Sequence, residues 1–132
     1  MAAVDPWAGE GGGARHNLGV ITTEQVREIV LALPETVERL AWGRPCFLVD
    51  EKIFTSIRDG DTELSVKVTD DNKAALVADY PDTFSVPAHY ARSPMFVVQL
   101  ATVDEARLRA LLTDAWRMTA PERLLANFNS AD

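Results

Sequence analysis

The sequence predicts a single α+β domain in which helices from both ends of the chain pack on one face of a mainly antiparallel sheet of about five strands. Two patterns carry this prediction. Polar and apolar residues alternate along Glu63–Val68, which is typical of an antiparallel strand with one buried face. Near both ends of the chain, apolar residues instead recur every three or four positions, which is the period of an amphipathic helix.

Residues 1–19 are predicted to be a flexible glycine-rich tail, and residues 20–128 to form the single domain. Five of the seven glycines lie in this tail, where little side chain is available for burial. The first helix is expected to start after Thr22, because Gln25 completes a capping box. Pro34 ends it, and its apolar face consists of Val26, Ile29, Val30 and Leu33.

Three short strands are predicted to follow, at Cys46–Val49, Lys52–Ile57 and Glu63–Val68. Asp50-Glu51 and the segment around Gly60 supply the turns between them. Strict alternation in the second strand would place Phe54 and Ser56 on the face opposite to Ile53, Thr55 and Ile57. One face of such a sheet covers the core, and we expect the other face to be open to water or to a ligand.

The second half of the chain predicts a short helix at Lys73–Tyr80 and a strand at Phe96–Leu100, and Thr83–Val86 could pair as a further strand. Thr102 and Glu105 suggest a capping box for the last long helix. Its apolar positions recur at helical spacing: Leu108, Leu111, Leu112, Ala115 and Trp116. Pro121 suits the first turn of a short final helix, Glu122–Asn127.

The composition limits the classes of function. The net charge of −7 argues against a protein that binds nucleic-acid phosphates through its overall charge. A local basic strip could still exist on a protein of this net charge. No apolar run approaches the roughly 20 residues of a membrane span, and the N-terminus lacks the pattern of a signal peptide. We therefore expect a cytoplasmic protein without membrane contact. The single cysteine, Cys46, excludes an internal disulfide and a multi-cysteine zinc site.

Trp42 and Arg44 belong to a Trp-Gly-Arg-Pro sequence that allows two interpretations. In the first, Trp42 packs at the sheet edge, Gly43 permits a turn and Arg44 pairs with a carboxylate. In the second, a planar ring and a forked cation are presented to a ligand, because arginine can hold a phosphate or carboxylate through two hydrogen bonds. We favour the structural interpretation and keep the second open.

The expected open face of the sheet could carry Phe54, Arg58, Ser65 and Lys67. Aromatic rings and cations on an open sheet are how single-stranded nucleic acid is bound, because bases stack while cations follow phosphates. Glu63 shares this face, and Phe54 could instead lie under a helix. The pattern therefore permits nucleic-acid binding without requiring it.

His89, Tyr90 and Arg92 are the best candidates for proton chemistry, since histidine titrates near neutral pH. A nucleophile would be Cys46 or Ser93, and neither lies in a recognisable motif. We expect Cys46 to be a buried, inert thiol. His89 has no second histidine at ligand spacing. We therefore predict a binding protein in preference to an enzyme, and we assign no catalytic residue, metal or cofactor.

Several short sequences together resemble the MmcQ/YjbR-like family: Leu33-Pro34-Glu35, Trp42–Phe47, Lys52-Ile53-Phe54, Tyr80-Pro81, His89-Tyr90 and Ala115-Trp116-Arg117 with Ala120-Pro121. The resemblance covers about residues 22–127. It implies a CyaY-like α+β domain, and it implies DNA as the ligand, although the acidic balance of this chain argues against that ligand. Contacts would come from Arg44, Lys52, Arg58, Lys67 and Arg92.

Two alternatives remain open beside weak, salt-sensitive DNA binding. The resemblance also implies a small-molecule binder, in the manner of a resistance protein, with a pocket expected between the sheet and the His89 loop. Trp42, Arg44, His89 and Tyr90 would then form the site. It could also act as an interaction module through an exposed strand edge, as a monomer or a homodimer.

Overall fold

The structure is a computed structural model, and it describes residues 20–131 of the chain. Within these residues, six strands form one fully antiparallel sheet in the order β1-β2-β3-β4-β6-β5. The predicted α+β class is therefore confirmed, with six strands in place of about five. The predicted tail, residues 1–19, lies outside the described residues.

The elements follow one another along the chain with short connections. The strands are β1 (Val37–Ala41), β2 (Arg44–Val49), β3 (Lys52–Ile57), β4 (Glu63–Lys67), β5 (Phe84–Ser85) and β6 (Met95–Gln99). The helices are α1 (Thr23–Leu31), α2 (Asp70–Asp79), α3 (Glu105–Thr119) and α4 (Glu122–Ala131), and two short 3₁₀ helices are η2 (Asp59–Asp61) and η3 (Ala88–Tyr90).

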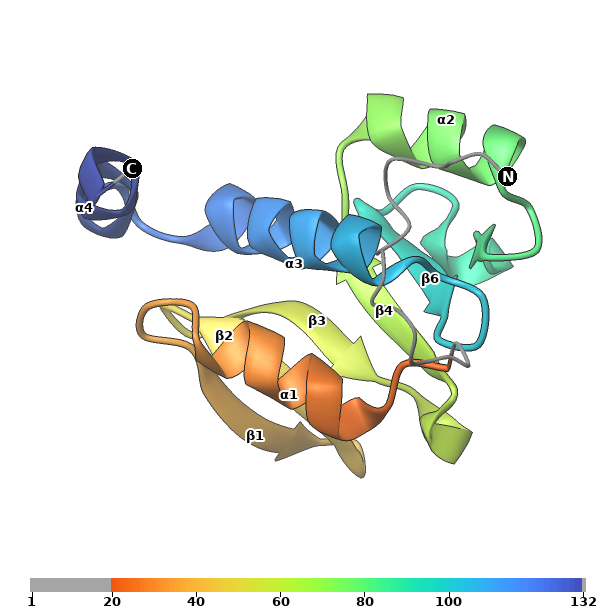
Figure 1. Cartoon of the computed structure of the whole chain (residues 1–132), viewed down its shortest axis with the longest axis horizontal. Helices are drawn as coiled ribbons and strands as arrows, with labels where there is room; N and C mark the ends of the chain where they lie inside the picture. Colours follow the sequence, from red (N-terminus) through yellow and green to blue (C-terminus); the bar gives the residue numbers. More distant parts are fainter. Residues whose placement is uncertain (1–19, 132) are drawn as a thin grey trace.

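Helices α1 and α3 lie side by side on one face of the sheet, with α3 over β3 and β4 (Figure 1). Their apolar stripes and the facing sheet residues form the core. All the apolar residues predicted for these two helices belong to it, and Trp116 of α3 is fully buried. Burial of this single continuous core is the main source of stability.

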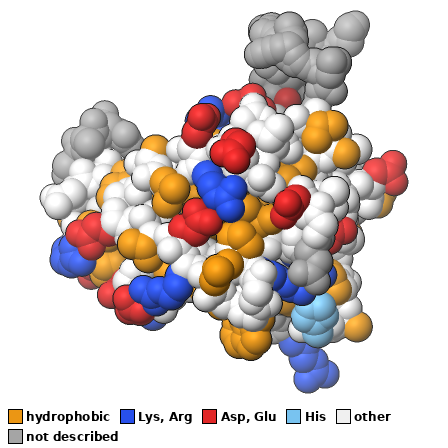
Figure 2. Space-filling model, turned by 90° about the horizontal axis from the view of Figure 1, so that it is seen from below, with side chains coloured by type: hydrophobic (Ala, Val, Ile, Leu, Met, Phe, Trp, Pro, Cys, Tyr) orange, Lys and Arg blue, Asp and Glu red, His pale blue; other side chains and the backbone are white. Residues whose placement is uncertain are grey.

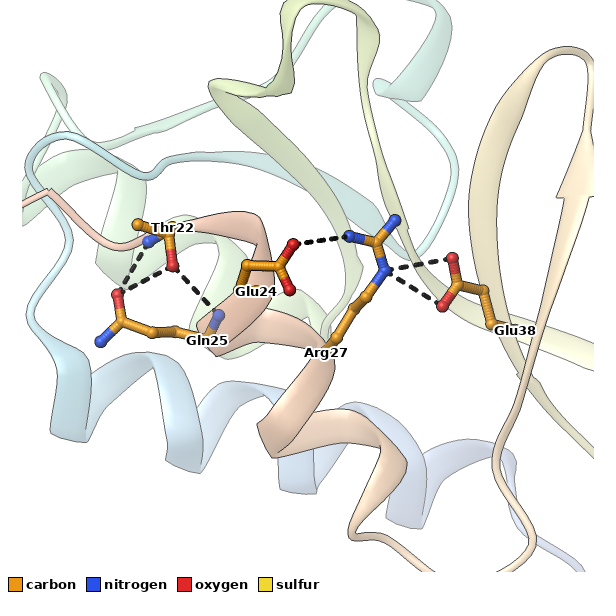
Figure 3. A network of polar contacts seen from close by, with 5 residues as sticks. All are labelled: Thr22, Glu24, Gln25, Arg27 and Glu38. Atoms are coloured by element: carbon orange, nitrogen blue, oxygen red, sulfur yellow. Dashed lines mark hydrogen bonds and ion pairs between the residues drawn. The ribbon is translucent and has the colours of Figure 1, made fainter.

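The start of α1 is held by the predicted capping box. The Thr22 side chain accepts a hydrogen bond from the Gln25 backbone, and the Gln25 side chain accepts one from the Thr22 backbone (Figure 3). One turn later, Arg27 Nε contacts Glu38 Oε1 of β1 at 3.1 Å. This ion pair ties α1 to the first strand of the sheet.

Strand β3 contains a bulge that overturns its predicted alternation. Phe47 faces Thr55 and Leu48 faces Ile53, so Phe54 is an extra residue without a partner on β2. Phe54 therefore joins Ile57 in the core instead of standing opposite to it, and it is fully buried. Of the two placements considered for Phe54, the open face is wrong and burial under the helices is confirmed, because strict alternation fails at a bulge.

Strand β1 was not predicted, because its side chains show no buried pattern and are mostly exposed. It pairs with β2 through a two-residue turn, Trp42-Gly43, in which both φ angles are positive, at 54° and 76°. This is the backbone of a type I′ hairpin. Asp50-Glu51 forms the same kind of turn between β2 and β3, with φ angles of 53° and 65°.

The last long helix begins two residues later than its predicted capping box requires. Asp104 is the N-cap and its carboxylate accepts a hydrogen bond from the Arg107 backbone. The hydroxyl of Thr102 instead lies 2.8 Å from that of Thr83, and it links this loop to the start of β5. The predicted break at Pro121 and the helix after it are confirmed as α4.

Candidate functional site

The eight residues predicted to bind a ligand fall into three groups, two at opposite ends of the sheet and a third, His89, Tyr90 and Arg92, in the loop around η3. Cys46 of β2 faces Ser56 of β3, so Arg44 and Arg58, two residues further along each strand, lie at the same end of the sheet. We call this the hairpin end, because Trp42 occupies its turn. Lys52 and Lys67 lie at the opposite end of their strands. The structure therefore does not gather the predicted residues into one patch.

Trp42 is the most exposed large apolar residue among those described, with 90% of its surface accessible. Its position follows from the turn, because a left-handed residue in a two-residue hairpin projects away from both strands. The interpretation in which Trp42 packs at the sheet edge is thus not what the structure shows. The ring is exposed to solvent, two residues before the start of β2 at Arg44.

Arg58 is the centre of a polar network on the face opposite to α1 and α3. Its Nε donates to Glu63 Oε1 at 2.9 Å, and its Nη1 donates to Ser65 Oγ at 3.3 Å. The hydroxyl of Tyr90 lies 2.9 Å from the same Ser65 oxygen, and the guanidinium carbon is 6.0 Å from the centroid of the Tyr90 ring. Ser65 is fully buried beneath this cover. The predicted open face is therefore closed at Ser65.

The loop that carries His89, Tyr90 and Arg92 is fastened to α2 by one side chain. Lys73 Nζ donates to the carbonyl oxygens of Tyr90 and Ser93, at 2.8 and 2.6 Å. The rings of His89 and Tyr90 are 4.4 Å apart between centroids, and His89 is exposed. Sequence reasoning assigned no role to Lys73, since nothing in the chain signals that its amine meets carbonyl groups far along the sequence.

Lys67 lies at a small cavity of about 210 Å³ between the end of β4, the start of α2 and the second half of α3. Burial and the nearby Lys52 ammonium lower the pKa of the Lys67 amine. Lys52 itself lies 3.5 Å from Asp50 and is largely exposed. These two lysines thus differ in environment, although both were predicted to contact the same ligand.

A second cavity, of about 470 Å³, opens between α2 and the segment that precedes and follows η3. Its wall is mostly apolar, with one acid and one base: Ala74, Val77, Ala78, Val86, Ala91, Asp70 and Lys73. It adjoins the His89 loop, as the small-molecule hypothesis expects, but it lies against α2. Trp42, Arg44, His89 and Tyr90 are not among the residues that line it.

The surface charge is largely neutralised by local ion pairs. At least seven basic side chains contact carboxylates: Arg27, Arg39, Lys52, Arg58, Arg109, Arg117 and Arg123. On the face shown in Figure 2, basic and acidic side chains are interleaved with apolar ones. That face therefore offers isolated cations to a phosphate chain and no continuous basic strip among the described residues.

Cys46, considered above as a nucleophile, is only 3% exposed, and burial raises the pKa of its thiol. The expectation of a buried cysteine is confirmed. In residues 20–131, no three His, Cys, Asp or Glu side chains are placed to hold a metal ion. Over the same residues, no helix is both long and apolar enough to cross a membrane.

Three comparisons with known proteins bear on this arrangement. The family model described as YjbR matches residues 31–118. An uncharacterized protein of Mycobacterium tuberculosis (strain H37Rv) is 33% identical over 123 residues, which cover 81% of this chain and 95% of that protein. An uncharacterized protein of Mycobacterium bovis matches to the same extent.

The fold comparison agrees with the sequence comparisons. The crystal structure of Deinococcus radiodurans protein DR2400, whose family is described as DUF419, superimposes with a TM-score of 0.63 at 20% identity. The match covers 74% of this chain and 77% of the other. At this sequence identity the similarity shows a shared fold only. The chemistry of the site has to be inferred from the side chains of this chain.

Proposed function

Because this chain belongs to the YjbR family, we propose that it is a non-catalytic binding module that binds single-stranded DNA weakly at the hairpin end of the sheet. The observation that supports this proposal is the 90% exposure of Trp42 on a tight hairpin turn. An indole ring that is accessible on a tight turn presents its face to solvent, where a nucleic-acid base can stack on it.

Arg44 supports a nucleic-acid ligand over a purely apolar one. It lies two residues after Trp42, and β2 brings it to the same end as Arg58. A ring for stacking beside a cation for phosphate is the minimal arrangement for a single-stranded nucleic acid. Arg39, Lys52 and Arg58 are each bound in an ion pair, so few phosphates are contacted, and the affinity is low and sensitive to salt.

The proposal is tested by fluorescence anisotropy with a labelled oligothymidine strand and with a duplex of the same length, at low and at physiological salt. Trp42→Ala removes one stacked base, which is worth about 1–3 kcal/mol, or roughly a 5- to 150-fold loss of affinity. Arg44→Gln reduces the salt slope by about 0.7 for each phosphate contact that is lost. Arg109→Gln is the matched control, because it removes an exposed charge from α3, which lies on the opposite face of the sheet from the Arg58 side chain.

Three outcomes contradict the proposal. The first is the absence of binding to the single strand at low salt. The second is binding that Trp42→Ala and Arg109→Gln weaken equally, which would indicate non-specific attraction. Tighter binding to the duplex than to the single strand would also count against stacking at Trp42.

A small-molecule ligand is the second candidate, and the 470 Å³ cavity beside α2 favours it. Its five apolar lining residues and its Asp70 and Lys73 side chains fit a ligand with an apolar body and one polar group. A thermal-shift screen tests this candidate, because a ligand that binds the native state raises the unfolding temperature. Ala78→Trp fills the cavity and should abolish the shift, whereas Trp42→Ala should leave it unchanged.

A further inference from the structure

The outer edge of β1, which faces away from β2, is the second unusual feature of the molecular surface. Within residues 20–131, β1 pairs only with β2, so its other edge presents free backbone donors and acceptors. Two of its apolar side chains are exposed, Val37 by 45% and Leu40 by 72%. Natural edge strands are usually protected by short length, proline or charge, and an exposed apolar edge is typical of a pairing surface.

We propose that β1 pairs antiparallel with β1 of a second copy of this chain, with Leu40 facing Leu40 of the partner. This inference does not rest on the proposed binding of DNA. Two copies related by a two-fold axis would join their sheets into one continuous sheet of twelve strands. Isologous pairing of this kind closes on itself and yields a dimer without open-ended growth.

The sequence of β1 selects the register. In a two-fold antiparallel pair, one residue faces its own copy, and residues equally far to either side face each other. Centring the pair on Glu38 or Arg39 would set like charges directly opposite, which destabilises the pairing. Centring it on Val37 or Ala41 would leave only that one residue facing a strand residue of the partner.

The Leu40 register avoids both problems. It sets Arg39 against Ala41 and buries the two most accessible apolar side chains of the strand against each other. Leu40 also faces Pro45 of β2 in its own sheet. Side chains that face each other across paired strands lie on one face, so the dimer would contain an apolar row of Pro45, Leu40 and their two copies.

The charges near β1 permit the approach of a second copy in spite of the net charge of −7. Glu38 pairs with Arg27 at 3.1 Å, and Arg39 pairs with Glu51 at 2.8 Å. Each charge of the strand is thus neutralised within its own chain before two edges meet. Two such edges therefore approach without strong long-range repulsion, whereas like charges set directly opposite each other in the paired strands would still repel.

Light scattering after size-exclusion chromatography, over about 10 to 500 µM protein, tests the association. We expect the apparent mass of the full chain to rise from 14.5 kDa toward twice that value. Leu40→Lys should hold it at the monomer mass across the range. Since Leu40 is largely exposed, this substitution leaves the fold intact, as the circular dichroism spectrum would verify.

Disulfide trapping tests the register. In a Cys46→Ala background, Leu40→Cys places two thiols directly opposite, with Cβ atoms roughly 4.5–5.5 Å apart, and mild oxidation should give a crosslinked dimer. Arg39→Cys and the exposed α3 control Ala106→Cys should crosslink at least tenfold more slowly. A monomer mass at 500 µM overturns the proposal, and so does equal or faster crosslinking through residue 39 or 106.

Discussion

Trp116 Nε1 donates a 3.0 Å hydrogen bond to the carbonyl oxygen of Pro34. The two residues are 82 positions apart in the chain, and the contact fastens α3 to the turn that follows α1. The indole ring is fully buried and also lies 4.8 Å from the ring of Phe128 in α4. One side chain therefore connects three helices.

Trp116→Phe tests this connection. The phenyl ring retains most of the apolar contacts but leaves the Pro34 carbonyl without its donor. We expect the free energy of unfolding to fall by about 1–3 kcal/mol, which is the cost of an unsatisfied buried polar group plus a small cavity. Urea denaturation followed by circular dichroism measures it. Trp42→Phe is the matched control, because it makes the same substitution at an exposed tryptophan. An equal loss of unfolding free energy in both variants would mean that the loss in Trp116→Phe does not come from the hydrogen bond.

The bulge in β3 predicts that neighbouring residues differ sharply in their contribution to stability. Phe54→Ala should cost about 3–5 kcal/mol, because the side chain is fully buried in the core. Ile53→Ala should cost clearly less, since Ile53 is only half-buried and lies outside the core cluster. Comparison of the two urea midpoints tests this, and a larger loss from Ile53→Ala than from Phe54→Ala would mean that β3 alternates without a bulge.

Trp42→Asn should stabilise the protein while weakening its binding. The residue has a φ of 54° and is followed by Gly43 at 76°, and asparagine followed by glycine is the preferred pair for this turn. Relief of the left-handed strain is worth about 1 kcal/mol. Thermal unfolding measures the gain and anisotropy the lost affinity. Gly43→Ala provides the opposite case and should destabilise, although its Cβ meets no neighbour.

Lys67 gives stability a distinct pH dependence. Burial and Lys52 lower the pKa of its amine in the folded state, so the unfolded chain binds the proton more tightly. The charged amine therefore lowers the free energy of unfolding at pH values below the lowered pKa. This destabilisation disappears as the pH rises through the lowered pKa toward 10.5, the ordinary pKa of a lysine amine. Lys67→Met should stabilise at pH 7 by up to about 0.5 kcal/mol, and this difference should shrink above pH 10.

Urea titrations of Lys67→Met and the original protein at pH 7 and pH 10.5 isolate this contribution, because the other titrating groups cancel in the difference. Lys52→Gln serves as the companion variant. It removes the repelling ammonium and should raise the pKa of the Lys67 amine. A pH-independent difference between Lys67→Met and the original protein would contradict the assignment.

Cys46 should react slowly with a thiol reagent in the native protein. Its sulfur is buried and the raised pKa of the thiol reduces the thiolate fraction at neutral pH. We expect reaction with Ellman's reagent to be at least tenfold slower than in concentrated urea. Rapid native reaction would mean that Cys46 is accessible and would reopen its role as a nucleophile.

Much of the fold could be derived from local patterns. The capping box of Thr22, the stripe that includes Leu108 and Trp116, and the alternation of Glu63–Val68 each determine a local element, because the periods of helix and strand are set by backbone geometry. The site was less accessible to this reasoning. Arg58, Ser65 and Tyr90 meet through strand pairing and loop closure across 32 residues of sequence, which no local period encodes.

By itself, the sequence determined the α+β class, the order of most elements and the apolar residues of the core, since these follow from hydrophobic periodicity and capping chemistry. The tertiary structure alone decided three features: the bulge that turns Phe54 inward, the strand β1 with its exposed Leu40, and the exposure of Trp42. Each depends on which strand lies beside which and on what covers them. Those relationships arise from packing between distant segments, and burial is settled only when the whole core assembles.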